Sequence, residues 1–165
     1  AKGASQWEPT LFLAPNGTLW LFWSEGVGTY SLYAATTDAR SGFQCWGPRR
    51  RILKPAPPHV TMWPINRVVV IPEDGTWALP CDWGCGQPTG AFAARSVDAG
   101  ATWEASPTIP GVGTGRLCPE PAMAMVNHRD GDGRALTCGG TSSSEHRQTT
   151  KHGAVQQQVL ASLGL

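Results

Sequence analysis

Six polar and aromatic side chains of this sequence could contact a ligand, because they flank apolar segments with a strand-like pattern. They are Arg67, Asp82, Glu8, Glu120, Trp63 and Trp83. A guanidinium group binds a carboxylate through two parallel hydrogen bonds, and an indole ring offers a flat apolar face for stacking. Carboxylates accept hydrogen bonds from hydroxyl groups. These residue types are therefore candidates for contacts with a ligand's carboxylate, hydroxyl groups or flat ring.

Each of these candidates also has a purely structural interpretation. Arg67 can pair with Glu8 or Glu120 inside the packed protein, and Asp82 can be an ordinary loop residue. Glu8 and Glu120 both precede a proline at equivalent places in the chain, which favours a repeated structural role. The tryptophans can fill a core between layers of structure instead of contacting a ligand. The residues alone leave both interpretations open.

A repeated pattern of strand, tight turn and strand organises the chain around these residues. The turns are Asn16-Gly17, Asp74-Gly75 and Asp132-Gly133, and their successive glycines are 58 residues apart. Asn-Gly and Asp-Gly supply the positive φ angles of tight hairpins, so each unit predicts a β-hairpin. Short apolar segments at 31–35 and 90–94 occupy matching places after the first two hairpins. Four short strands in every 58 residues are typical of a propeller blade.

One turn between such segments carries a complete motif, Ser-x-Asp-x-Gly-x-Thr-Trp. Its defined positions are Ser96, Asp98, Gly100, Thr102 and Trp103. In such a turn the aspartate accepts backbone N–H groups, the glycine adopts a left-handed conformation, and the tryptophan covers the apolar layer. The motif is an Asp box, and with the repeat it resembles the sialidase (neuraminidase) superfamily, specifically proteins with bacterial-neuraminidase (BNR) repeats. Asp38 and Trp46 resemble the corresponding residues of a degenerate copy.

The resemblance covers about residues 7–137 and includes the run 63–80. It implies an all-β, six-bladed propeller, of which this chain would supply about three four-stranded blades. We therefore expect residues 1–140 to form a partial sialidase-like β-propeller with 58-residue repeats. Residues 141–165 are expected to form a polar tail that could include a short helix at 154–163. We also expect the chain to be part of a longer protein.

The resemblance further implies enzymes that cleave terminal sialic acids from glycoconjugates. Family members use three arginines to bind the substrate carboxylate, a tyrosine nucleophile paired with a glutamate, and an aspartate as acid and base. The Arg-Ile-Pro motif of the first arginine does not occur here, and Tyr30 and Tyr33 share one strand-like segment. No catalytic nucleophile can be assigned. In a propeller, ligands bind where the innermost strands begin and the second strands end, which places the six candidates and Glu25 on one face.

We therefore expect a sialidase-like glycoside hydrolase fragment that acts on terminal sialic acid or related sugars of glycoconjugates, or derives from an enzyme that does. The alternative is a non-catalytic glycan-binding or protein-interaction remnant of a propeller. A carbohydrate ligand is the expected partner in both cases. Unpaired strand edges of a partial propeller also predict self-association.

Charge and cysteine content narrow the remaining classes of function. The chain has 13 Lys plus Arg and 12 Asp plus Glu, a net charge of +1 that gives no electrostatic footprint for nucleic acid. We interpret the one basic cluster, 49–51, as a solvated loop. No apolar run is long enough for a membrane span. Cys81 and Cys85 leave half a zinc site or a disulfide open, but no histidine has metal-motif spacing, so we expect no metal and no cofactor.

Overall fold

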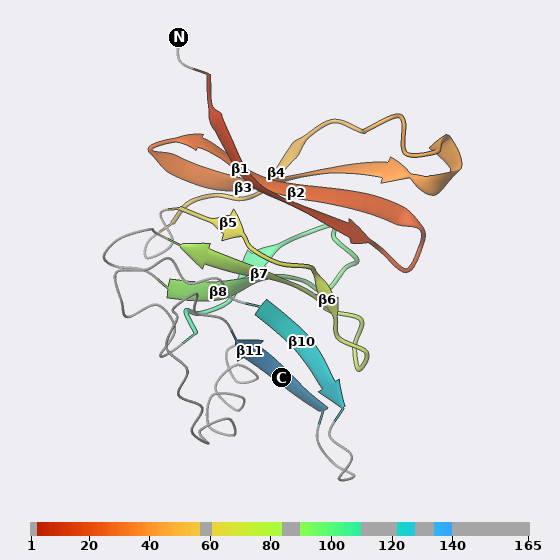
Figure 1. The fold of residues 1–165 in the computed structure, drawn as a ribbon, viewed down its shortest axis with the longest axis vertical. Helices are drawn as coiled ribbons and strands as arrows, with labels where there is room; N and C mark the ends of the chain where they lie inside the picture. The colour runs from red at the N-terminus through yellow and green to blue at the C-terminus, as the bar shows by residue number, and fades with distance from the viewer. Residues whose placement is uncertain (1–2, 57–60, 84–89, 110–121, 128–133, 140–165) are drawn as a thin grey trace.

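The computed structural model describes residues 3–56, 61–83, 90–109, 122–127 and 134–139, which form antiparallel β-sheets stacked as layers (Figure 1). The first sheet has the order β1 (Ser5–Leu13), β2 (Thr18–Val27), β3 (Thr29–Asp38) and β4 (Arg50–Leu53). Within the described residues the only helical element is a single 3-10 turn, η1 (Ala39–Ser41). The predicted all-β class is confirmed for these residues.

The second sheet repeats the order of the first with one difference at its inner edge. It comprises β5 (Trp63–Pro64), β6 (Val69–Val70), β7 (Trp77–Trp83), β8 (Gly90–Ser96) and β9 (Glu104–Ala105). Both β5 and β6 pair with β7, so two short strands stand where the first sheet has the single strand β1. Pro64 has no N–H group to donate to the ladder, which is consistent with a short strand there.

The third unit is a hairpin of β10 (Ala122–Asn127) and β11 (Arg134–Gly139), and β10 lies beside β6. The strands of all three repeated hairpins are therefore present at the predicted places. The glycines of the first two turns, Gly17 and Gly75, have φ angles of 83° and 74°, as tight hairpin turns require. The predicted 154–163 helix, the tail and Glu120 lie outside the described residues.

The main core lies between the first two sheets. Trp20 and Phe22 alternate along β2 and face the second sheet, which contributes Trp77, Leu79 and Phe92. This alternation follows from the two-residue period of a strand. The Trp20 and Trp77 rings meet edge to face with centroids 5.5 Å apart. Next to this core, β5 of the second sheet lies against β1 and β2 of the first.

The Ser96–Trp103 turn is held by hydrogen bonds from its own side chains. Asp98 accepts from the Thr102 backbone N–H at 2.8 Å and from the Thr102 hydroxyl at 2.6 Å. The Ser96 hydroxyl donates to Asp98 and accepts from the Gly100 N–H at 2.7 Å. Trp103 donates its indole N–H to the Gly100 carbonyl at 3.1 Å. The turn is thus a self-contained unit that delivers Trp103 to the core, where it meets Phe22.

The equivalent turn of the first sheet is looser. Asp38 accepts one backbone N–H, from Arg40 at 2.7 Å, and Trp46 remains 42% exposed. The three extra residues between Asp38 and Trp46 include Gly42 and Phe43, which both have positive φ angles. This insertion moves the tryptophan away from the position that Trp103 occupies in the second sheet.

Arg50, in the basic cluster 49–51, links the two sheets. The cluster is exposed, as a solvated loop would be, but the loop interpretation was wrong for Arg50 and Arg51, which belong to β4. Arg50 belongs to β4, and its guanidinium lies 5.0 Å from the centre of the Trp20 ring. It donates hydrogen bonds to the carbonyls of Gly100 and Ala101, in the turn of the second sheet. A planar guanidinium can stack on an indole and donate to two carbonyls together, so its exposure does not leave it unbound.

The Asp98 carboxylate should make the stability of the fold sensitive to acid. Hydrogen bonds from Thr102 lower the pKa of Asp98 from its usual 3.8 to about 2. Because the folded-state pKa is depressed, the stabilisation is complete above about pH 4 and is lost as the pH falls toward 2. We expect the melting temperature of the wild type to fall more steeply across this window than that of Asp98→Asn, in thermal melts followed by circular dichroism. Parallel pH profiles for the two proteins would contradict this role for Asp98.

Candidate functional site

A row of residues joins the two sheets at the ends of β2 and β7. Trp7 lies opposite Ser24 in the β1–β2 register, and Trp63 lies opposite Asp82 in the β5–β7 register. The Ser24 hydroxyl donates to the carbonyl of Met62, the residue before Trp63. The row therefore runs from β1 through β2 and β5 to β7. It brings together two of the predicted site residues, Trp63 and Asp82, from separate strands.

Asp82 and Trp83 are more deeply buried than a ligand-contacting loop would be. Asp82 is 1% exposed within β7, so its interpretation as a loop residue was wrong. Trp83 is 6% exposed, and its ring lies over Gly90, where a Cβ atom would come within 2.5 Å of the indole nitrogen. Only glycine tolerates such a close approach, which favours the core-filling interpretation of Trp83.

Arg67, Glu8 and Trp63 are the more accessible members of the predicted set. Arg67 is exposed between β5 and β6, and Glu8 is exposed in a bulge of β1 with a φ angle of 51°. Within the described part of the chain no ion pair joins Arg67 to Glu8, which was one of its alternative partners. Trp63 is half-buried and contacts the Tyr30 ring at 6.0 Å between centroids. Glu120 lies outside the described residues.

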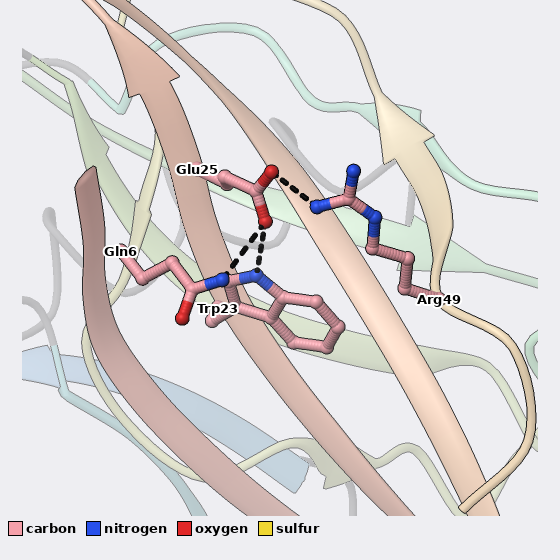
Figure 2. A network of polar contacts seen from close by, with 4 residues as sticks. All are labelled: Gln6, Trp23, Glu25 and Arg49. Atoms are coloured by element: carbon pink, nitrogen blue, oxygen red, sulfur yellow. Dashed lines mark hydrogen bonds and ion pairs between the residues drawn. The ribbon is translucent and has the colours of Figure 1, made fainter. Parts of the chain in front are cut away.

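Next to this row, Glu25 forms the centre of a polar network (Figure 2). The Glu25 side chain is 8% exposed, and its carboxylate accepts hydrogen bonds from Gln6 at 3.1 Å and from the Trp23 indole at 3.2 Å. Arg49 reaches in from the segment before β4 and forms an ion pair with the same carboxylate. The Arg49 guanidinium also lies 5.5 Å from the centre of the Tyr33 ring. The network thus ties β1, β2 and the approach to β4 together at one end of the sheet.

The network determines the charge state of Glu25. Burial raises the pKa of Glu25, but hydrogen bonds from Trp23, Arg49 and Gln6 and the positive charge of Arg49 outweigh it. The pKa of Glu25 is therefore below its ordinary value, and the side chain is an anion at neutral pH. Arg49 is 59% exposed, so part of its guanidinium faces solvent.

The sequence contained a signal for this network that composition alone does not reveal. Glu25 stands 58 residues before Trp83, at the same position of the repeat. A buried apolar position in one unit is a carboxylate in the other, and a buried carboxylate requires partners. The sequence predicted Glu25 near the end of the second strand of its unit, whereas its pairing with Arg49 was not predicted.

Removing the Glu25 carboxylate should have a measurable cost. Glu25→Ala deprives Trp23, Gln6 and Arg49 of their shared acceptor, and we expect a loss of about 1–2 kcal/mol in the free energy of unfolding in urea. The matched control is Glu104→Ala, because Glu104 is 69% exposed and 3.7 Å from Arg95. We expect the control to change stability by less than about 0.5 kcal/mol. Equal losses for the two variants would show that the network adds nothing.

A hollow of about 350 Å³ lies beside the network and is lined by Gln6, Trp7, Pro9, Leu21 and Trp23. The walls of the hollow are mostly apolar, and one of the lining residues, Trp7, is 53% exposed. It lies on the side of the first sheet that faces away from the second sheet. The hollow is thus separate from the core described above.

The described residues contain no group of three or more His, Cys, Asp or Glu side chains placed to hold a metal ion. Cys81 is a free, buried thiol in β7, and burial raises its pKa above the ordinary value for cysteine. Cys85 lies outside the described residues. No helix in the described ranges is both long and apolar enough to cross a membrane.

The stacked antiparallel sheets fit part of a β-propeller-like fold. This chain is similar in structure to the Hadza microbial sialidase Hz136, with a TM-score of 0.58 and 16% sequence identity. The match covers 91% of this chain. The matched part is 34% of that sialidase, so the chain spans about a third of its length. No protein-family model and no curated protein matches the sequence. At this level of identity the likeness shows the fold, which agrees with the antiparallel sheets described above.

Proposed function

We propose that this chain is part of a sialidase-like glycoside hydrolase acting on terminal sialic acid or related acidic sugars. The likeness of its fold to a sialidase over 91% of the chain carries this proposal. In a propeller, the ends of the strands around the central channel are the usual place for a ligand. We infer that the row from Trp7 to Asp82 lies at such an end. It supplies aromatic rings and a carboxylate, and Arg67, which follows β5, adds the positive charge that an acidic sugar requires.

We assign the sugar contacts to the accessible residues at this end. Arg67 is exposed between β5 and β6, and its guanidinium would bind the carboxylate of the sugar through two hydrogen bonds. Trp63 is half-buried and would stack on the sugar ring, while Glu8 would accept hydrogen bonds from hydroxyl groups. Asp82 and Trp83, buried beneath them, would position the end of β7. Glu120, from the third repeat unit, would add a further contact to the sugar.

The proposal is tested by measuring binding and turnover on the same sample. Binding of N-acetylneuraminic acid and its methyl glycoside is followed by saturation-transfer NMR, and turnover is followed with a fluorogenic sialic-acid glycoside. We expect Arg67→Ala to weaken binding by about 10- to 100-fold, the usual range for a charge-assisted hydrogen bond. Arg40→Ala is the control, because Arg40 is an exposed arginine in η1, away from the strand-end row.

The outcomes separate the hydrolase from its alternative. Turnover that Arg67→Ala reduces and Arg40→Ala does not would support a hydrolase site on this chain. Arg67-dependent binding without turnover would instead assign the chain to the non-catalytic glycan-binding class. A folded sample that neither binds nor cleaves sialic acid, or variants that behave alike, would contradict the proposed site.

A further inference from the structure

The free edge of the first sheet carries a line of basic side chains. β4 is the last strand in the order β1-β2-β3-β4, and no described strand pairs with its other side. Arg49 precedes β4, Arg50 and Arg51 begin it, and Lys54 follows it; all four are exposed. We call these four residues the basic edge. In a propeller-like fold with β1 innermost, β4 is the strand farthest from the central channel, so a neighbouring blade would leave this edge in solvent.

The basic edge keeps most of its positive charge uncompensated. Arg49 pairs with the carboxylate of Glu25 but remains 59% exposed. Arg50 is held by an indole ring and by two carbonyl groups, which are neutral. Among the residues that the structure describes, no ion pair or side-chain hydrogen bond involves Arg51 or Lys54. Arg51 and Lys54 are thus the two groups most available to a ligand.

A register shift in β4 determines which way these side chains point. Tyr33 lies opposite Arg51, whereas Leu32 lies opposite Leu53, so Ile52 is an extra residue in the β3–β4 ladder. An extra residue of this kind reverses the alternation of the side chains that follow it. Leu53 accordingly packs against the core from the same side as Leu32, with which it is paired.

The shift brings Arg51 and Lys54 to one side of the strand. Arg51 shares the side of its partner Tyr33. Lys54 follows the core-facing Leu53 and therefore points the same way as Arg51. In a regular strand, residues three positions apart would point to opposite faces. Arg49 lies over the Tyr33 ring, 5.5 Å from its centre, and adds a third charge to this side.

A purely protective role is the simplest alternative for charges on an edge strand, because they prevent pairing with the sheet of another molecule. The second sheet shows how little this role requires. Its edge strand β9 consists of Glu104 and Ala105, with a single charge. The basic edge has four charges and no basic counterpart in β9. It is thus a property of the first unit and is not required by the architecture of the sheets.

The segment before β4 extends the line of the basic edge with an aromatic ring. The Gly47 N–H donates to the carbonyl of Thr36 at 2.8 Å, so the chain already runs beside β3 at this point. Trp46, the residue before Gly47, is 42% exposed. Its indole offers a flat apolar face on which a ring of a ligand can stack. Positive charges and an exposed aromatic ring therefore follow one another along the same edge.

We propose that the basic edge binds an anionic polysaccharide, with the acidic groups of successive sugars on Arg49, Arg51 and Lys54. A guanidinium binds a carboxylate or sulfate group through two hydrogen bonds, and an ammonium group adds a point charge. From Arg49 to Lys54 the chain covers roughly 15 Å, because a strand rises about 3.3 Å per residue. A polymer spans this length, whereas one monosaccharide does not. That the polymer is a glycan and not a nucleic acid rests on the proposed function.

Isothermal titration calorimetry with polysialic acid, which carries carboxylates, and with heparin, which carries sulfates, tests the proposal. We expect Arg51→Glu and Lys54→Glu each to weaken binding about 10-fold at low ionic strength, because each replaces an attraction with a repulsion. The affinity of the wild type should fall as the salt concentration rises to about 0.15 M. Arg40→Glu is the control, because it changes the net charge equally at an exposed residue of η1, which follows the far end of β3. Circular dichroism confirms that each variant is folded.

Three results would overturn the inference. They are a folded wild type that binds neither polymer, variants at Arg51 and Lys54 that bind as tightly as Arg40→Glu, and duplex DNA that binds as tightly as both glycans. Arg67→Ala separates this inference from the proposed function, since it should weaken the binding of N-acetylneuraminic acid and leave heparin binding unchanged. A chain that binds heparin through Arg51 but does not bind N-acetylneuraminic acid would contradict the proposed function alone.

Discussion

Trp77→Ala should cost about 3–5 kcal/mol of unfolding free energy, the largest loss we expect from a single substitution in this chain. Trp77 is 3% exposed at the centre of the contact between the first two sheets. Its ring lies 4.9 Å from Phe12, 5.5 Å from Trp20 and 6.4 Å from Trp103, between centroids. Truncation to alanine therefore removes contacts with both sheets and with the Ser96–Trp103 turn. Urea denaturation followed by far-UV circular dichroism measures the loss.

Trp46→Ala is the matched control for Trp77→Ala. Trp46 is 42% exposed and follows the looser turn of the first sheet. The same atoms are removed from a position with far less burial, so we expect a loss below about 1 kcal/mol. Similar losses for the two variants would mean that the packing between the sheets does not stabilise the fold as described.

Gly100→Ala should destabilise the protein by about 2–4 kcal/mol, from two causes that add. Gly100 has a φ angle of 89°, which strains any residue with a Cβ atom. A Cβ atom there would also lie 2.6 Å from the Trp20 ring and 2.8 Å from the Trp77 ring. Such overpacking typically costs 1–3 kcal/mol in addition to the backbone strain. Thermal and urea denaturation report the sum.

Gly17→Ala separates these two causes. Gly17 has a similar φ angle of 83°, but nothing lies within 4 Å of the position of its Cβ atom. It therefore measures the backbone strain alone, which we expect to be about 1 kcal/mol. The difference between the two variants is the contribution of the tryptophan rings above Gly100. If that difference is absent, the Ser96–Trp103 turn is not packed under Trp20 and Trp77.

The local signals in the sequence were sufficient to predict the strands and the described hairpin turns. Asn16-Gly17 and Asp74-Gly75 predict hairpins because few dipeptides adopt the required positive φ angles, and both glycines have them. The Ser96–Trp103 motif predicts its own hydrogen bonds, since every donor and acceptor lies within a few residues along the chain. These features depend on near neighbours, so no knowledge of the packing is needed to foresee them.

Other features depend on segments that are distant in the sequence. Glu25 pairs with Arg49 across 24 residues, and Arg50 reaches carbonyl groups of the second sheet across 50 and 51 residues. The sequence showed only a run of three arginines, because nothing local indicates which carboxylate or carbonyl a long side chain will meet. Asp82 looked like a loop residue because it follows an apolar strand, but β7 continues through Trp83.

The sequence by itself thus determined the all-β class, the 58-residue repeat and the turns, because hairpin chemistry and strand periodicity are local. Only the tertiary structure decided which sheet faces are covered and which polar side chains find partners. Burial and long-range pairing depend on how sheets stack. The same alternation of apolar residues along a strand is compatible with a sheet face that another sheet covers and with one that no sheet covers. Leu21 and Leu79 occupy the same repeat position, yet Leu79 is fully buried and Leu21 lines an open hollow.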